Sequence, residues 1–198
     1  MKNRTQSLIF MAVLAGITLL LGFTPIGYIR VGVIELTLMG LPVIIGTITM
    51  GWKTGLGLAA LFVITSLFQS LQSPVAPTLW GTSPLGFIVG VVVPRLLIPV
   101  TVTLTYRLMH TKKEVVNLGV ASVVGSLTNT FLFLGILYLF FANTGANAIV
   151  LLIVSAGLIN GLCEAVLTLV VCPPIIRALR KSMPSLRPRT AEIKEITQ

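Results

Sequence analysis

Long apolar runs follow one another along the chain, and short stretches rich in Pro, Gly, Lys and Arg separate them. A helix that crosses the hydrocarbon core of a bilayer needs about 20 mostly apolar residues. The pattern predicts six membrane-spanning helices, over about residues 8–23, 34–50, 55–71, 85–108, 115–141 and 148–176. The predicted fold class is all-α: an integral membrane bundle of six transmembrane helices in one domain over residues 1–181. The polar residues 182–198 are expected to form a disordered tail.

The composition supports a membrane protein and excludes several other classes. Of the 198 residues, 55% are hydrophobic and 10% are charged, whereas a soluble domain carries roughly 25% charged residues. The mean hydropathy is +1.01. These values exclude a soluble enzyme, a nucleic-acid-binding domain and a disulfide-linked secreted module for the chain as a whole. We expect a multi-pass protein of the cell membrane that has no nucleic-acid partner.

The placement of the basic residues predicts the orientation of the bundle. Of the 14 Lys and Arg residues, all but Arg30 and Arg95 lie at one set of alternate helix ends or in the tail. Positively charged loops stay on the cytoplasmic side of a membrane. Both termini are therefore expected in the cytoplasm, which requires an even number of crossings. The net charge of +9 reflects this topology.

Motifs for catalysis are missing from the sequence. It has no G-x-x-x-x-G-K-[ST] loop for nucleotide phosphates, no H-E-x-x-H, no C-x-x-C and one histidine. Cys163 and Cys172 fall on opposite sides of a helix, so they neither bridge nor share a metal. We expect binding and translocation, with no enzymatic activity, cofactor or metal. The energy for active transport must come from an ion gradient or from another subunit.

Several polar residues fall inside the predicted spans, where each needs a partner or a purpose. Arg95 lies in PRLLIP of the fourth helix, Asn160 and Glu164 share a face of the sixth, Asn129 lies in the fifth and Gln69 near the outer end of the third. Their similar depths predict one shared polar cavity. Two alternatives stay open: an Arg95–Glu164 ion pair that only joins helices, and a purely interhelical hydrogen bond for Asn129.

The two longer outer connections are unusually apolar. Residues 24–33 contain Tyr28, and residues 73–84 contain Trp80 between three prolines. Either segment can act as a lid over a cavity or as an aromatic anchor at the membrane interface, and both interpretations remain open. Glu35 is expected to begin the second helix.

The first predicted helix carries small residues on one side. Ala12 and Gly16 are four residues apart, with Ala15 beside them. Such a stripe lets a second helix approach closely, either within the bundle or in a partner protein.

These features together resemble the substrate-binding S component of energy-coupling factor (ECF) vitamin transporters. The similarity covers about residues 5–181 and rests on the order and spacing of six pieces: the Ala12-x-x-x-Gly16 stripe, TPIGYI, LPVIIGTITMGWKTGLGLAALFVITSL, PRLLIP, GSLTNTFLFLGILYLFF and INGLCEAVLTLVVCPPIIRAL. The resemblance implies a vitamin site near the outer face, closed by the first outer loop and the loop between the third and fourth helices. It also implies an ABC-type complex with a transmembrane coupling subunit, which contacts the stripe, and two cytoplasmic ATPases.

Within that family the chain is most similar to the pantothenate and pyridoxine/hydroxymethylpyrimidine subgroup. The resemblance therefore implies pantothenate uptake, with pyridoxine or hydroxymethylpyrimidine as alternatives. For pantothenate, Arg95 would take the carboxylate, and Gln69, Asn129 and Asn160 would take the amide and hydroxyl groups. A stand-alone ion-coupled carrier is the alternative from another class, but the sequence has no Asp and no evident inverted repeat.

Overall fold

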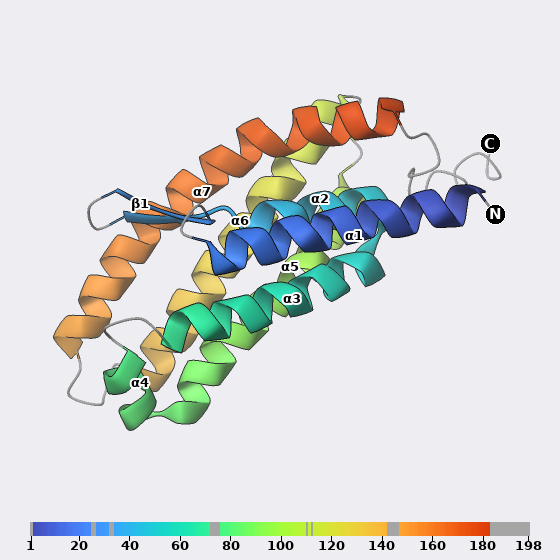
Figure 1. The fold of residues 1–198 in the computed structure, drawn as a ribbon. Coiled ribbons are helices and arrows are strands. Elements are labelled where there is room, and N and C mark those ends of the chain that lie inside the picture. Colours follow the sequence, from blue (N-terminus) through green and yellow to red (C-terminus); the bar gives the residue numbers. More distant parts are fainter. Residues whose placement is uncertain are drawn as a thin grey trace.

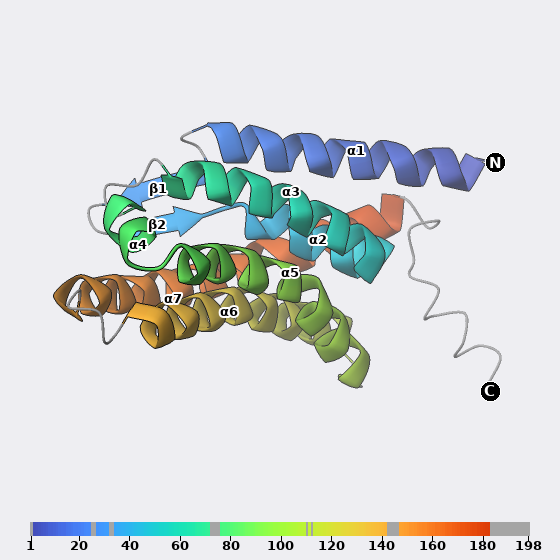
Figure 2. The same cartoon turned by 90° about the horizontal axis from the view of Figure 1, so that it is seen from below.

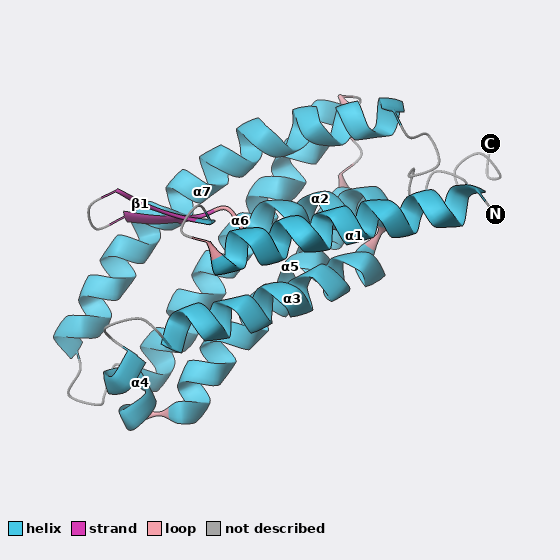
Figure 3. Cartoon of the chain, in the orientation of Figure 1, coloured by secondary structure: helices cyan, strands magenta, loops and turns pink. Residues whose placement is uncertain are grey.

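The structure is a computed structural model that describes residues 2–24, 27–31, 34–71, 76–109, 111, 113–141 and 147–182. Within these residues the chain is helical apart from one two-stranded sheet (Figure 1, Figure 3). In chain order the elements are α1 (Lys2–Phe23), β1 (Tyr28–Val31), β2 (Ile34–Thr37), α2 (Gly40–Met50), α3 (Trp52–Leu71), α4 (Ala76–Thr82), α5 (Pro84–Leu108), α6 (Glu114–Phe141) and α7 (Asn147–Ser182).

The long helices pack into a layered bundle. In Figure 2, α1 lies on one face and α6 with α7 on the opposite face, while α2, α3 and α5 lie between them. The start of α1 and the end of α7 lie at one end of the bundle, and the hairpin and α4 lie at the other (Figure 1). The first of these ends, here called the basic end, carries Lys53, Arg107, Lys113 and Arg180 at the termini of their helices.

The prediction of a single helix over residues 34–50 is wrong in its first part. Residues Ile34–Thr37 form a strand that pairs antiparallel with Tyr28–Val31, and Arg30 lies opposite Glu35 in the register. Glu35 therefore does not begin a helix. The β-branched residues in this segment and the Gly and Pro residues before it favour a hairpin over a helix.

Five helices are long and apolar enough to cross a membrane in the described residues. They include the segments Thr5–Phe23, Trp52–Ser70, Pro84–Leu108, Glu114–Phe141 and Ile153–Ser182. Helix α2 has 11 residues, which gives a length of about 16 Å, roughly half of the hydrocarbon core. The expected outer loop at residues 73–84 also contains a short helix, α4.

Helix α2 lies at the centre of the bundle and is buried on all sides. Its residues from Pro42 to Thr49 are all buried. The main core cluster joins α2 to Phe10 and Leu14 of α1, to Phe62 of α3 and to residues of α5, α6 and α7. A helix that is apolar all round suits this central place, because it has no face turned to polar surroundings.

Glycines allow the central helices to approach one another. A Cβ at Gly125 of α6 would collide with the Val102 side chain of α5, and one at Gly46 of α2 would collide with Leu58 of α3. Gly51 has a φ of 95° and ends α2, so the chain turns directly into α3. Small residues at such contacts are typical of helices packed in membranes.

Arg180 joins four helices at the basic end. Its Nη1 donates to Glu114 Oε1 of α6 at 2.5 Å and to the Tyr106 hydroxyl oxygen of α5 at 3.0 Å. Its Nη2 donates to the carbonyl oxygen of Ile48, in the last turn of α2, at 3.3 Å. The Arg180 side chain is 13% exposed and that of Glu114 is 50% exposed. A cation at the carbonyl end of α2 is also favoured by the helix dipole.

Arg180→Ala should therefore destabilise the bundle, whereas Arg177→Ala should not, because Arg177 is exposed one turn earlier on α7. We expect a loss of about 1.5–3 kcal/mol for Arg180→Ala, the usual range for hydrogen bonds to a charged group. For a chain of this size the melting temperature would fall by roughly 3–12 °C. Thermal unfolding of both purified variants in the same detergent measures this, and equal melting temperatures would contradict the four-helix role.

Candidate functional site

A small cavity lies where the end of β2 meets α2, α5, α6 and α7. Its volume is about 10 Å³, which is enough for about one water molecule. The lining residues are Thr37, Gly40, Ile44, Ile98, Ser126, Asn129, Glu164 and Thr168. The wall is thus apolar on the α2 and α5 side and polar on the α6 and α7 side.

Glu164 holds the hairpin against α7. Its Oε1 accepts a hydrogen bond from the backbone N–H of Thr37 at 2.9 Å and another from the Thr37 hydroxyl at 2.5 Å. The two residues are 127 positions apart in the chain. Because Glu164 is 9% exposed, these two donors compensate part of the cost of keeping a carboxylate inside the bundle.

Asn129 contributes a polar atom that has no hydrogen-bond partner among the described residues. Its Oδ1 is buried and makes no hydrogen bond to any described residue. Leaving an amide oxygen unpaired in an apolar interior is costly, so native proteins pair such groups with water or a ligand. Asn129 lines the cavity, where a bound molecule can supply the missing donor.

Arg95 lies one turn from the cavity-lining residue Ile98 on α5. Pro94 has no N–H, so the Gly90 carbonyl oxygen loses its usual partner in the helix. Arg95 Nη1 donates to that oxygen at 3.2 Å. A proline in the sequence thereby creates an acceptor that orients the neighbouring arginine.

Aromatic rings fix the other faces of the Arg95 guanidinium. Its central carbon lies 5.0 Å from the centre of the Phe133 ring on α6 and 5.7 Å from that of Phe62 on α3. Both distances are within the range of a cation–π interaction. The guanidinium also interacts electrostatically with Glu164, whose carboxylate takes its two hydrogen bonds from Thr37. The Arg95–Glu164 ion pair stays an alternative interpretation beside the two hydrogen bonds that Thr37 makes to Oε1.

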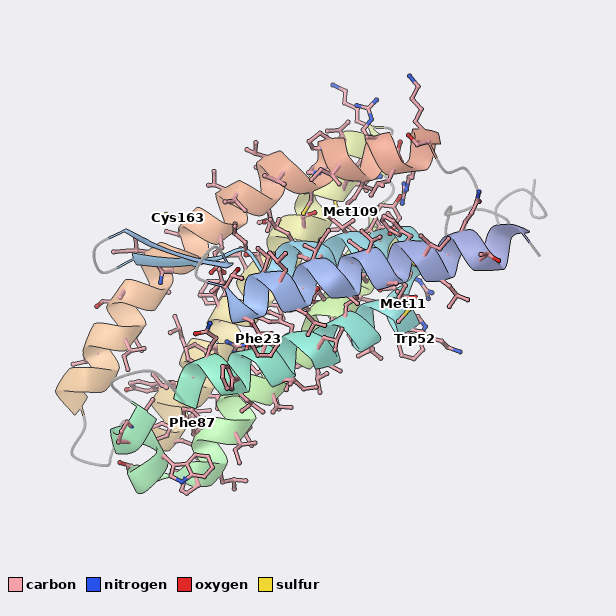
Figure 4. All side chains as sticks on the ribbon, viewed as in Figure 1. Met11, Phe23, Trp52, Phe87, Met109 and Cys163 are labelled. Atoms are coloured by element: carbon pink, nitrogen blue, oxygen red, sulfur yellow. The ribbon has the colours of Figure 1, made fainter. Side chains whose placement is uncertain are left out.

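The other predicted polar residues lie outside the cavity wall described here. Gln69 Nε2 donates to the carbonyl oxygen of Gly22 at 3.0 Å, on the α1–α3 contact where the rings of Phe23 and Phe68 also meet at 5.5 Å (Figure 4). Asn160 is half-buried on α7, one turn before Glu164. Their predicted role in binding stays a prediction.

The two aromatic residues of the outer connections differ in what the structure describes. Trp80 of α4 is 44% exposed, and its ring meets that of Phe87 on α5 edge to face, with centres 5.7 Å apart. This contact holds α4 against the start of α5. Tyr28 belongs to β1, but its side chain lies outside the described residues.

Three polar lining residues were missed in the sequence: Thr37, Ser126 and Thr168. Thr168 follows Glu164 by one helical turn, and Ser126 precedes Asn129 by about one turn. The rule that residues three or four apart share a helix face would have found both. Thr37 carried no such signal, because its place depends on the hairpin.

The small-residue stripe of α1 faces away from the bundle. Phe10, Leu14 and Thr18 are buried at intervals of four residues, which leaves Ala12 and Gly16 exposed on the other side. A Cβ at Gly16 would meet nothing within 4 Å. Ala15 is half-buried and packs against the core. The surface formed by Ala12 and Gly16 is called the α1 stripe below.

The comparisons with known proteins agree with this architecture. Residues 6–176 match the family described as "ECF transporter, substrate-specific component". The chain belongs to this family. It is also 30% identical over 158 residues to the pantothenic acid transporter PanT of Lactococcus lactis subsp. cremoris (strain MG1363), a match that covers 74% of this chain and 78% of that protein. The predicted family is therefore confirmed, and the protein is the substrate-specific subunit of a vitamin transporter.

The hydrogen bond between Thr37 and Glu164 should contribute measurably to the stability of this S component. Thr37→Val keeps the side-chain shape and the backbone N–H but removes the hydroxyl donor, so we expect a loss of about 1.5–3 kcal/mol. The control is Thr101→Val. The Thr101 hydroxyl donates only to carbonyl oxygens of its own helix, at 3.1 Å, and these oxygens keep their backbone hydrogen bonds in the variant. Thermal unfolding in detergent compares the two, and an equal loss would argue against a hairpin held by Glu164.

Proposed function

We propose that this S component binds pantothenate from the outside of the cell and passes it inward as part of an ECF complex. The observation that carries the proposal is the position of Arg95: an oriented cation beside a cavity whose wall holds a carboxylate, an amide and three hydroxyl groups. Pantothenate has a carboxylate at one end, an amide in the middle and two hydroxyl groups at the other end. The similarity of this chain to a pantothenic acid transporter supports pantothenate as the substrate.

In this proposal Arg95 binds the carboxylate, with charge-assisted hydrogen bonds from its guanidinium. Asn129 and Glu164 contact the rest of the molecule from the cavity wall. Gln69 and Asn160 are the further polar residues that we assign to the outer part of the site. Tyr28 and Trp80 belong to the segments proposed to close over the ligand.

Binding requires the cavity to widen. Its volume of about 10 Å³ is far below the roughly 300–1,000 Å³ of typical ligand pockets. The hairpin is the element best placed to move, because it meets α7 through the Thr37–Glu164 contact at the cavity. We therefore propose that the hairpin and the connection around α4 act as lids.

The proposed topology has six crossings and both termini in the cytoplasm of a cell-membrane protein. The hairpin and α2 together make the second crossing, since α2 alone is too short. With this crossing counted, the basic end falls on one side of the membrane, in agreement with the positive-inside rule.

The proposed partners are a transmembrane coupling subunit and two cytoplasmic ATPases, and no cofactor is needed on this chain. The α1 stripe supports the first of these assignments. Ala12 and Gly16 are exposed on the outer face of α1, and Ala15 supports that surface from the bundle side. A smooth helix face allows a close approach without interlocking side chains.

In the absence of partner subunits, the purified chain should bind pantothenate but should not accumulate it. Calorimetric titration in detergent measures binding, with pyridoxine and hydroxymethylpyrimidine as competitors. Proteoliposomes that contain only this chain should show no concentrative uptake under a proton or sodium gradient. Accumulation driven by such a gradient would favour the ion-coupled carrier, and preferential binding of pyridoxine would replace the proposed substrate.

Ala12→Trp should separate ligand binding from assembly. The α1 stripe points away from the cavity, so pantothenate affinity of the isolated chain should stay within a few fold of the parent. Co-purification with the coupling complex and ATP-driven uptake should fall sharply, because the indole blocks close helix contact. The control is Leu162→Trp, which introduces the same indole at a residue of α7 that is 64% exposed. If Ala12→Trp assembles as well as this control, the α1 stripe is not the docking face.

A further inference from the structure

Two side chains of the cavity wall, Glu164 and Asn129, carry oxygens with unused hydrogen-bonding capacity. Both hydrogen bonds from Thr37 end on Oε1 of Glu164, and Oε2 accepts none from the residues that the structure describes. Asn129 Oδ1 is buried and equally unpartnered among them. The cavity wall thus presents two oxygen acceptors, one from α7 and one from α6.

A ligand group that satisfies these two oxygens must be a hydrogen-bond donor. An ionised carboxylate has only acceptors, and beside Glu164 it would meet a like charge. A hydroxyl group or an amide N–H supplies what both oxygens need. The carboxylate of an anionic ligand is therefore directed away from Glu164 and toward Arg95 on α5.

We propose that Glu164 and Asn129 bind the hydroxyl-bearing end of the substrate and thereby set its orientation, with Thr37 as the positioning residue for the Glu164 carboxylate. This inference rests on the proposed function and adds to it the direction in which pantothenate lies. The site selects a small anion that carries hydrogen-bond donors at the end remote from its carboxylate. An anion of the same shape without those donors supplies no hydrogen bond to either oxygen, which costs affinity.

Thr37 gives this end of the site its geometry. Its N–H and its hydroxyl hold the same carboxylate oxygen, so the second oxygen has a defined direction. Because Thr37 ends β2, the position of the hairpin and the orientation of Glu164 depend on each other. Closing the hairpin over a ligand therefore also places the acceptor that the ligand hydroxyl needs.

The test measures the affinity of the purified full chain and of three variants for pantothenate and for two altered ligands, by titration. The ligands are pantothenate, pantothenyl alcohol, in which a hydroxymethyl group replaces the carboxylate, and an analogue that lacks both hydroxyl groups. The variants are Arg95→Met, Glu164→Gln and Thr37→Val, with Thr101→Val as the control. In the parent each ligand change should weaken binding by roughly tenfold or more.

The proposal expects each variant to remove one preference and keep the other. Arg95→Met should lose the preference for pantothenate over pantothenyl alcohol but keep the preference for the hydroxyl groups. Glu164→Gln should do the reverse, and Thr37→Val should weaken the hydroxyl preference alone. Thr101→Val should keep both.

Two outcomes would overturn the orientation. If Glu164→Gln removes the carboxylate preference and Arg95→Met the hydroxyl preference, the substrate lies the other way round. If both variants reduce both preferences equally, neither Arg95 nor Glu164 is specific for one end of the ligand. Should Glu164→Gln fail to fold, Thr37→Val carries the same comparison. A parent chain that binds none of the three ligands contradicts the proposed function itself, which separates that failure from a wrong orientation.

Discussion

Polar groups inside the hydrocarbon must find their partners within the protein, since no water is available there. Much of this bundle follows from that constraint. Threonine hydroxyls return to carbonyl oxygens of their own helix, as Thr18 does to Leu14 and Thr128 to Val124. The carbonyl that Pro94 leaves unpaired is the one at Gly90, and it accepts from Arg95. Pro94 thus accounts both for a missing backbone hydrogen bond in α5 and for the orientation of the Arg95 side chain.

Two polar groups with unused hydrogen-bonding capacity lie at the candidate site. Asn129 Oδ1 lacks a partner among the described residues, and Glu164 uses one of its two oxygens for both of its hydrogen bonds. Both residues line the cavity next to the hairpin. In the proposed function a ligand supplies the donors that these groups lack.

The two ends and the outer face of the bundle meet different requirements. At the basic end, Arg180 joins α2, α5, α6 and α7 through the Tyr106 and Glu114 side chains and the backbone carbonyl oxygen of Ile48. On the outer face of α1, Ala12 and Gly16 are exposed, while Phe10 and Leu14 anchor the helix from the inner side. In the proposed function this outer face meets the partner subunit, and the hairpin end changes shape.

The sequence by itself determined the helical class, the family and the ends of most long helices, because each depends on local apolar length and on helix periodicity. Residues 85–108 and 115–141 were predicted within one residue of α5 and α6. It also identified Arg95, Asn129 and Glu164, since charged and amide groups stand out in an apolar helix. The spacing of Ala12 and Gly16 is visible in the sequence, but only the packing of α1 shows that these residues face away from the bundle.

Only the tertiary structure decided where the second apolar run stops being a helix and which polar residues meet. Residues 34–37 contain β-branched side chains that suit a strand, but they are continuous with the apolar run of α2. The pairing with Tyr28–Val31 decides where the strand lies within that run. The meeting of Thr37 with Glu164 spans 127 positions. It depends on how the hairpin folds back across α7, so the residue that positions the acceptor could not be read from spacing along any one helix.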